Sequence, residues 1–203
     1  MKRLLLLRHG RTTYNHAGRI QGQLDSQLDE TGLAQARAVA PSIAAYAPVL
    51  IRSSDLSRAA VTADIVAAEC GLPVTRDPRL RERHFGDTQG MTYADFAARF
   101  PEQHRAFLAG DPEAVPGAEK ISELRDRLVA GLRELLDELP EGATAVAVAH
   151  GLAIKHAVGA LLGWDAEGAA VLHGMDNCHW AELRVDDDGQ VRLVAYNRGT
   201  PIS

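Results

Sequence analysis

Short apolar runs alternate along this chain with longer segments in which apolar residues recur at helical spacing. The first run covers residues 4–7 and ends abruptly at Arg8-His9-Gly10, and two further runs cover 49–52 and 144–149. Continuous apolar runs of this length are typical of strands buried on both faces, as in parallel sheets. We therefore expect three buried strands in the core.

Between these strands, apolar residues recur at the spacing of an α-helix. Helices are expected over 31–43, about 57–70, 122–139 and 151–162. Ser54 or Asp55 is the expected N-cap of the second of these helices. The polar segment 12–27 is expected to be a loop, because glycines interrupt it, and 74–76 a short strand.

Two other segments complete the predicted architecture. Two short helices between 92 and 109 carry Phe96, Phe100 and Phe107, which predicts a cap over the sheet rather than a second domain. Near the C-terminus, residues alternate through 178–185 and 191–196 around an aspartate-rich turn, which predicts a hairpin. The aspartates of that turn are interpreted as turn residues and not as metal ligands.

This order of elements predicts an α/β fold with a mostly parallel central sheet and a C-terminal hairpin. At 203 residues, we expect a single domain over 1–203, with a helical cap inserted at about 86–120. Cys70 falls in a predicted helix and Cys178 in a predicted strand. Their spacing matches no metal or redox motif, so both are expected to be reduced and structural.

Charge narrows the classes of partner. A formal net charge of −5 argues against nucleic-acid binding, which usually needs a basic face. The apolar run at 4–7 is too short for a signal peptide, and no window approaches the ~18 apolar residues of a membrane span. We expect a cytoplasmic protein with no membrane partner, whose arginines form a local focus for a small anionic substrate.

Cationic residues follow the predicted strands where each strand ends. Arg8 and His9 follow the first, Arg58 follows the second, and His150 follows the third. Any one of them alone fits an ordinary loop or a solvated charge. The carboxyl ends of parallel strands meet at one edge of a sheet, so we expect the four side chains to converge there. Guanidinium groups bind phosphate oxygens bidentately, and a neutral imidazole can attack phosphorus.

The expected chemistry is therefore phosphoryl transfer with His9 as nucleophile. Neighbouring cations favour the neutral form of His9, and Glu82 is the leading candidate for the proton donor to the leaving group. The amides of Gly151 and Leu152 lie at a predicted helix N-terminus, which suits an anion. No histidine pair has helical zinc spacing and no Gly-x-Ser-x-Gly motif occurs, so neither a metal nor a serine nucleophile is expected.

At this point the chain resembles the histidine phosphatase superfamily, also called phosphoglycerate-mutase-like. Five blocks carry the resemblance, in the family's order and over nearly the whole chain. They are Leu7-Arg8-His9-Gly10-Arg11-Thr12 with Asn15; Gln21-Gly22-Gln23-Leu24-Asp25 with Leu28 and Thr31-Gly32; Ser53-Ser54-Asp55-Leu56-Ser57-Arg58-Ala59 with Thr62-Ala63; Leu80-Arg81-Glu82-Arg83-His84-Phe85-Gly86 with Gln89-Gly90; and Ala149-His150-Gly151.

The resemblance implies a three-layer α/β/α sandwich and a phosphohistidine on His9. It implies that Arg8, Arg58 and His150 hold the phosphoryl group and that Glu82 donates the proton. No metal and no organic cofactor is implied. Further phosphate or substrate contacts are expected from the 12–27 loop and the start of the helix that follows His150, at Asn15, Gln21, Gly22, Gly151 and Leu152.

Two activities are compatible with this family. Its cofactor-dependent mutases have a tyrosine where Phe85 stands, a lysine where Tyr93 stands, and paired arginines in the cap that are absent between Phe107 and Glu119. We therefore favour a metal-independent phosphomonoesterase, with a phosphoglycerate mutase as the alternative. A non-catalytic phosphate-binding module is disfavoured, because binding alone needs neither a nucleophile nor an acid.

Within the phosphatases, segments 174–183 and 21–25 resemble the actinobacterial glucosyl-3-phosphoglycerate phosphatase and broad-specificity phosphatase group. Residues 116–120 depart from the Gly-Gly-Glu-Ser block of much of the family, which leaves substrate orientation open. The family often dimerises, and a homodimer through a sheet edge or helix is compatible with the sequence. The sequence does not name the phosphorylated metabolite.

Overall fold

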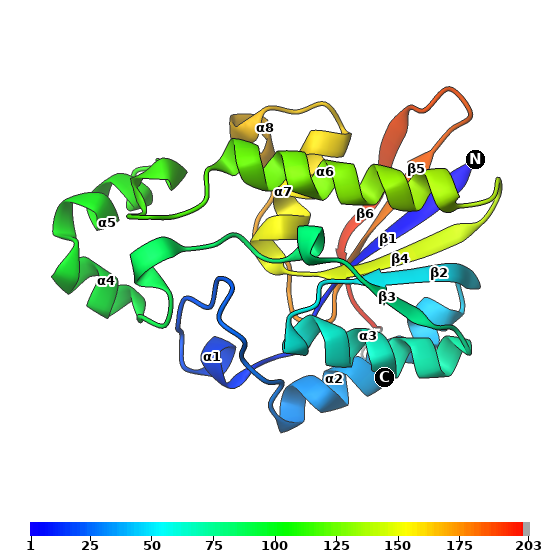
Figure 1. Ribbon diagram of the computed structural model, residues 1–203, viewed down its shortest axis with the longest axis horizontal. Coiled ribbons are helices and arrows are strands. Elements are labelled where there is room, and N and C mark those ends of the chain that lie inside the picture. Colours follow the sequence, from blue (N-terminus) through cyan, green and yellow to red (C-terminus); the bar gives the residue numbers. More distant parts are fainter. Residues whose placement is uncertain (201–203) are drawn as a thin grey trace.

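The computed structural model describes residues 1–200 and shows one six-stranded sheet with helices on both faces (Figure 1). The strand order is β3-β2-β4-β1-β5-β6. Strands β1 to β4 are mutually parallel, while β5 and β6 form an antiparallel hairpin at one edge. The bounds are β1 (Lys2–Arg8), β2 (Pro48–Ser53), β3 (Val74–Arg76), β4 (Thr144–Ala149), β5 (Trp180–Val185) and β6 (Val191–Arg198).

Eight α-helices occur in the described part of the chain. They are α1 (Thr13–His16), α2 (Glu30–Ala44), α3 (Ser57–Cys70), α4 (Tyr93–Arg99), α5 (Pro101–Leu108), α6 (Ile121–Glu138), α7 (Gly151–Leu161) and α8 (Ala166–Ala170). In residues 1–200, no helix is both long enough and apolar enough to cross a membrane.

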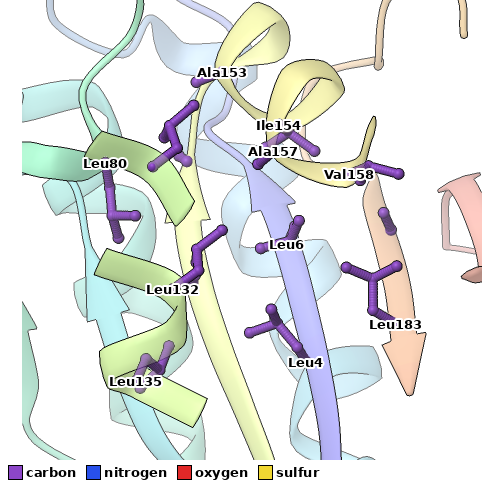
Figure 2. Packing of buried hydrophobic residues seen from close by; sticks show 14 of the residues in the cluster. Leu4, Leu6, Leu80, Leu132, Leu135, Ala153, Ile154, Ala157, Val158 and Leu183 are labelled. Carbon is purple, nitrogen blue, oxygen red and sulfur yellow. The ribbon is translucent and has the colours of Figure 1, made fainter. Parts of the chain in front are cut away.

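Strand β1 divides the hydrophobic core into two layers, because its side chains alternate between the two faces. Leu4 and Leu6 pack with α6 and α7, whereas Leu5 and Leu7 pack with α2 and α3. Figure 2 shows the first layer, with Leu132 of α6 and Ile154 of α7 against the strand. All four leucines of β1 are at most 1% exposed, so the predicted three-layer α/β/α fold is confirmed.

The start of α3 differs from the sequence prediction. The helix begins at Ser57, and the residue before it is Leu56, so the predicted N-cap at Ser54 or Asp55 is wrong. Asp25, from the distant 12–27 loop, accepts from the Ser57 amide at 2.7 Å and takes the capping role. Asp55 is instead paired with the Arg81 guanidinium.

Three smaller expectations also change. The 12–27 segment contains the short helix α1, which begins with a capping box between Thr12 and Asn15. The helix α8 has no counterpart in the sequence prediction. Cys178 lies in a turn with φ of 56° before β5, not in the strand itself.

The predicted aromatic cluster is present in the segment between β3 and α6. Phe96 of α4 is buried with Ile20 and Val115, and Phe100 and Phe107 pack against them. Ile20 comes from the loop after β1, so this cluster joins the α4–α5 segment to that loop. The segment extends beyond the ends of the parallel strands, on the side where the strands finish (Figure 1).

Candidate active site

The two predicted histidines lie side by side because β1 and β4 are adjacent and in register. Arg8 pairs with Ala149, so the next residues, His9 and His150, leave the sheet together. The His9 amide donates to the Ala149 carbonyl at 3.1 Å, and the two ring centroids are 5.1 Å apart. Both side chains are buried, at 2% and 0% exposure.

The hydrogen bond of His9 determines its tautomer. Its Nδ1 lies 2.7 Å from the Gly10 carbonyl oxygen, which only accepts, so the neutral ring carries its hydrogen on Nδ1. The lone pair of Nε2 is then available for attack. Burial, with Arg58 and Arg8 nearby, holds the pKa of His9 well below 6.5, so the ring is neutral near pH 7.

His150 carries the opposite tautomer. Arg58 Nε donates to His150 Nδ1 at 3.2 Å, which leaves the ring hydrogen on Nε2. That hydrogen points to Ser54 Oγ at 2.9 Å. Burial, again with Arg58 among the neighbouring cations, holds the pKa of His150 well below 6.5.

Arg58 connects the second strand end to the 12–27 loop. Its terminal nitrogens donate to the carbonyls of Leu24 at 2.8 Å and Gly22 at 2.7 Å. These bonds offset the unfavourable position of a cation in the first turn of α3. Burial lowers the pKa of Arg58 to about 10, so the group stays charged at neutral pH. Arg58 thus uses three of its five N–H groups, because its Nε–H is bonded to His150. Two N–H groups remain for a ligand.

Arg8 is the second arginine whose charge acts on His9. Its Nη1 donates to the Met175 carbonyl, and its buried Nε has no hydrogen-bond partner in the described part of the chain. Burial lowers the pKa of this guanidinium. Arg8 Nε would be 3.4 Å from a Cβ placed on Gly151, which puts the guanidinium at the N-terminus of α7.

Glu82 is seated at the same helix N-terminus. Its two carboxylate oxygens accept from the amides of Leu152 at 3.1 Å, Ala153 at 2.9 Å and Arg83 at 2.9 Å. The amide of Leu152, a predicted phosphate contact, therefore faces Glu82 in this structure. The three donors fix the carboxyl group beside the arginines.

Asn15 and Gln21 come from the loop after β1. The Asn15 side-chain oxygen accepts from Thr12, and the Gln21 side-chain oxygen accepts from Thr12 Oγ1 at 2.9 Å. The oxygens are thus used inside the loop, which leaves the amide NH₂ groups to face a ligand. Gly22 has φ of 55°, a left-handed backbone conformation that favours glycine.

These residues surround one cavity of about 400 Å³. Nine of the ten predicted site residues line it, namely Arg8, His9, Asn15, Gln21, Gly22, Arg58, Glu82, Gly151 and Leu152. The tenth, His150, is completely buried beside His9 and Arg58. In residues 1–200, no group of three or more His, Cys, Asp or Glu side chains is arranged to hold a metal ion.

Further polar residues of the site were not selected from the sequence. Ser54 orients His150, and Asn177 donates to the His9 carbonyl at 2.9 Å. Lys155 and His156 line the cavity from α7. Their positions four residues after Gly151 and Leu152 were a usable signal, because residues four apart share a helix face. Asn177 gave no comparable local signal.

Comparison with known proteins shows the family to which the chain belongs. The family model described as histidine phosphatase superfamily (branch 1) matches residues 4–198. The chain belongs to the histidine phosphatase superfamily. A glucosyl-3-phosphoglycerate phosphatase of Mycolicibacterium vanbaalenii is 40% identical over 198 residues, covering 93% of this chain and 88% of that protein.

A solved structure and a second curated relative extend the comparison. The structure of a mycobacterial glucosyl-3-phosphoglycerate phosphatase in complex with VO3 is 38% identical, covers 97% of this chain and 99% of that one, and superposes with a TM-score of 0.90. A protein of Photorhabdus laumondii named probable phosphoglycerate mutase GpmB is 37% identical, over 88% of this chain and 82% of its own length. Family membership therefore includes relatives named for both activities considered above.

Proposed function

We propose that this protein is a metal-independent phosphomonoesterase that hydrolyses a small phosphorylated metabolite through a phosphohistidine on His9. The observation that carries the proposal is the buried, neutral His9 with a free Nε2, which lines one cavity together with Arg8 and Arg58. Relatives named as phosphatases, 37–40% identical over most of the chain, support the same reaction class.

In the first step, Nε2 of His9 attacks phosphorus and the ester oxygen leaves on the opposite side. Negative charge on the phosphoryl oxygens is stabilised by Arg8 and the two unused N–H groups of Arg58. The leaving oxygen takes a proton from Glu82, whose carboxyl group is held at the start of α7. The products of this step are an alcohol and phosphohistidine.

In the second step, water attacks the phosphohistidine and Glu82 takes its proton. The phosphorus–nitrogen bond breaks, the electron pair returns to Nε2 of His9, and phosphate leaves. His150 supports both steps by holding Arg58 through its Nδ1. Asn15, Gln21 and the Gly151 amide complete the phosphate contacts in this proposal.

We also propose that residues 86–120 act as the cap of this site. Phe107 and Pro112 of that segment line the cavity, and the segment packs on the loop after β1 through Phe96 and Ile20. The cap supports hydrolysis rather than mutase chemistry, because residues 108–118 contain no lysine or arginine to hold a second phosphate. Phe85 and Tyr93, which replace a tyrosine and a lysine of mutases, also line the cavity.

Location and assembly are part of the proposal. We propose that the protein acts in the cytoplasm, where its two free cysteines, Cys70 and Cys178, would stay reduced. We propose a homodimer through the edge strand β6, where Val194 is 47% exposed. Sedimentation measures the oligomeric state, and we expect the wild type to be a dimer and Val194→Glu to be a monomer. A monomeric wild type would contradict the proposal.

The His9→Ala variant tests the catalytic proposal. Without its nucleophile the protein should release phosphate from p-nitrophenyl phosphate at least about 10³-fold more slowly, with no added metal. His16→Ala, which removes an exposed histidine of α1, is the matched control and should keep wild-type activity. Undiminished release by His9→Ala would exclude the phosphohistidine route.

The same preparation separates phosphatase from mutase. Wild-type protein is incubated with 3-phosphoglycerate and a catalytic amount of 2,3-bisphosphoglycerate. Our proposal predicts free phosphate and little 2-phosphoglycerate. Rapid formation of 2-phosphoglycerate that depends on the bisphosphate would show a mutase instead.

A further inference from the structure

One arginine that does not line the cavity binds the chain segment that carries Glu82. Arg127, on α6, donates from Nη1 to the carbonyl oxygens of Arg79 and Arg81, both at 2.7 Å. Its Nη2 donates to the carbonyl oxygen of Glu82 itself at 2.9 Å. Three backbone carbonyls of the segment 79–82 therefore accept from one guanidinium group, to which the proposed reaction assigns no role.

Glu119 holds that guanidinium group in place. Its Oε1 accepts from Arg127 Nε at 2.6 Å and its Oε2 accepts from Arg127 Nη2 at 2.8 Å, which makes a bidentate pair. Every N–H group of Arg127 then has an acceptor, and none remains for a ligand. Burial opposes ionisation of Glu119, but the hydrogen bonds from Arg127 outweigh it and lower the pKa of this carboxyl group.

The same glutamate also binds the backbone that follows the acid. The Glu119 amide donates to the His84 carbonyl at 2.9 Å, and the His84 amide donates to Glu119 Oε2 at 3.2 Å. The Glu119 carbonyl accepts from Arg83 Nε at 2.7 Å. Glu119 belongs to residues 116–120, whose departure from the family's Gly-Gly-Glu-Ser block left substrate orientation open. In the structure this glutamate binds its neighbouring segment and does not line the cavity.

The helix α6 gives these contacts a rigid base. Leu124 and Leu128, which flank Arg127 on the helix, are buried in the core layer that also contains Leu4 and Leu6 of β1. The carboxylate of the acid is held separately, by amides at the start of α7. The acid residue is therefore fixed at its carbonyl by α6 and at its carboxylate by α7.

We infer that Arg127 is a positioning residue for Glu82, and that its pairing with Glu119 fixes the backbone from which the acid reaches the leaving oxygen. The inference rests on the proposed function, in which Glu82 gives that oxygen its proton. A proton donor acts only within hydrogen-bond reach of the receiving atom, so a shift of about 1 Å in the segment would remove much of the rate. The loss should concern proton donation rather than phosphate binding.

Arg127→Gln tests the inference with two matched esters. Phenyl phosphate and p-nitrophenyl phosphate differ by one nitro group, and the phenolate that leaves from the first is more basic and has the greater need of a proton. We expect kcat/KM to fall about tenfold further for phenyl phosphate than for p-nitrophenyl phosphate. Equal losses with both esters would overturn the inference and assign Arg127 a purely structural role.

A matched control separates positioning from stability. Arg52 is a buried arginine that also contacts α6, donating to the Gly131 carbonyl at 3.1 Å and to both carboxylate oxygens of Glu138 at 2.8 Å. Arg52→Gln should unfold at a lower urea concentration than the wild type but keep its ratio of kcat/KM for the two esters. The same change of ratio in Arg52→Gln as in Arg127→Gln would contradict a specific role for Arg127.

Two further variants keep the test decisive if Arg127→Gln folds poorly. Glu119→Gln leaves the arginine in place but weakens its pairing, and should change the ratio in the same direction by about threefold. A wild-type ratio in Glu119→Gln would overturn the inference. In a Glu82→Gln background, Arg127→Gln should change the ratio no further, because the two residues act as one unit. The same factor in both backgrounds would show that Arg127 acts independently of the acid.

Amide hydrogen exchange adds a measurement that does not depend on activity. Residues 79–84 should exchange at least about fivefold faster in Arg127→Gln than in Arg52→Gln, because their carbonyls lose the guanidinium group. Equal exchange in the two variants would overturn the inference.

The His9→Ala protein separates this inference from the proposed reaction. If His9→Ala releases phosphate like the wild type, the proposed reaction fails and the inference falls with it. If release requires His9 but Arg127→Gln and Glu119→Gln both keep the wild-type ratio, the inference alone fails.

Discussion

At the scale of single residues, the site is determined by which nitrogen of each histidine carries the hydrogen. Gly10 gives His9 a carbonyl acceptor, and Arg58 gives His150 a donor. The two adjacent imidazoles therefore have opposite tautomers. His9 has a free lone pair at Nε2. His150 instead donates from Nε2 to Ser54 Oγ and accepts from Arg58 at Nδ1.

Ser54→Ala tests the positioning role of Ser54. Losing the hydroxyl leaves the Nε2–H of a fully buried His150 without its partner, which costs about 1–3 kcal/mol. We expect kcat to fall about tenfold with KM little changed, because His150 then holds Arg58 less firmly. Steady-state kinetics measure this, with Ser53→Ala as control, since that buried hydroxyl donates to the Ser54 carbonyl. Equal losses in both variants would assign Ser54 a packing role only.

At the scale of elements, the end of β1 is fixed by a close backbone contact with the start of α2. A Cβ on Gly10 would lie 2.5 Å from the Gly32 carbonyl oxygen, and one on Gly32 would lie 2.0 Å from the Arg11 oxygen. Asp29 caps α2 by accepting from the Gly32 amide at 2.8 Å. The backbone at the start of α2 is therefore in close contact with the segment that carries His9, just after β1.

Gly10→Ala should move this strand end. The added methyl group would clash with backbone atoms, which move only at a cost in free energy, so we expect the free energy of unfolding to fall by about 1–3 kcal/mol. Activity should fall by a larger proportion, because His9 shifts. Urea unfolding and phosphate release measure the two effects. Gly174→Ala, where a Cβ meets nothing within 4 Å, should unfold like the wild type. Wild-type stability in Gly10→Ala would show that the two elements can separate.

At the scale of the whole molecule, the fold holds three buried histidines in their neutral form. The pKa values of His9 and His150 lie well below 6.5, and that of His156 is lowered to about 4. The unfolded chain therefore binds protons below about pH 6.5 that the folded chain does not bind. Stability is present above pH 6.5 and is lost as the pH falls from 6.5 toward 4.

Urea unfolding at pH 7.5 and 5.5 tests this linkage. Each such histidine should contribute about 1.4 kcal/mol to the difference in unfolding free energy, or about 4 kcal/mol for all three. His156→Gln removes one titrating group and should reduce the pH dependence by about a third. The same dependence in variant and wild type would mean that His156 titrates normally in the folded protein.

The sequence by itself determined the strands, most helices and the residues that gather at the sheet edge. Buried runs such as 4–7 and the helical spacing of 122–139 are local patterns that can be read from the sequence. Parallel strands all end at the same edge of a sheet, whatever their order in it. Tertiary structure alone decided how those residues are used. Asp25 caps α3, Glu82 occupies the start of α7, and the histidine tautomers differ. Each depends on a carbonyl, an amide or a side chain brought alongside by strand register and loop packing, which local spacing does not encode.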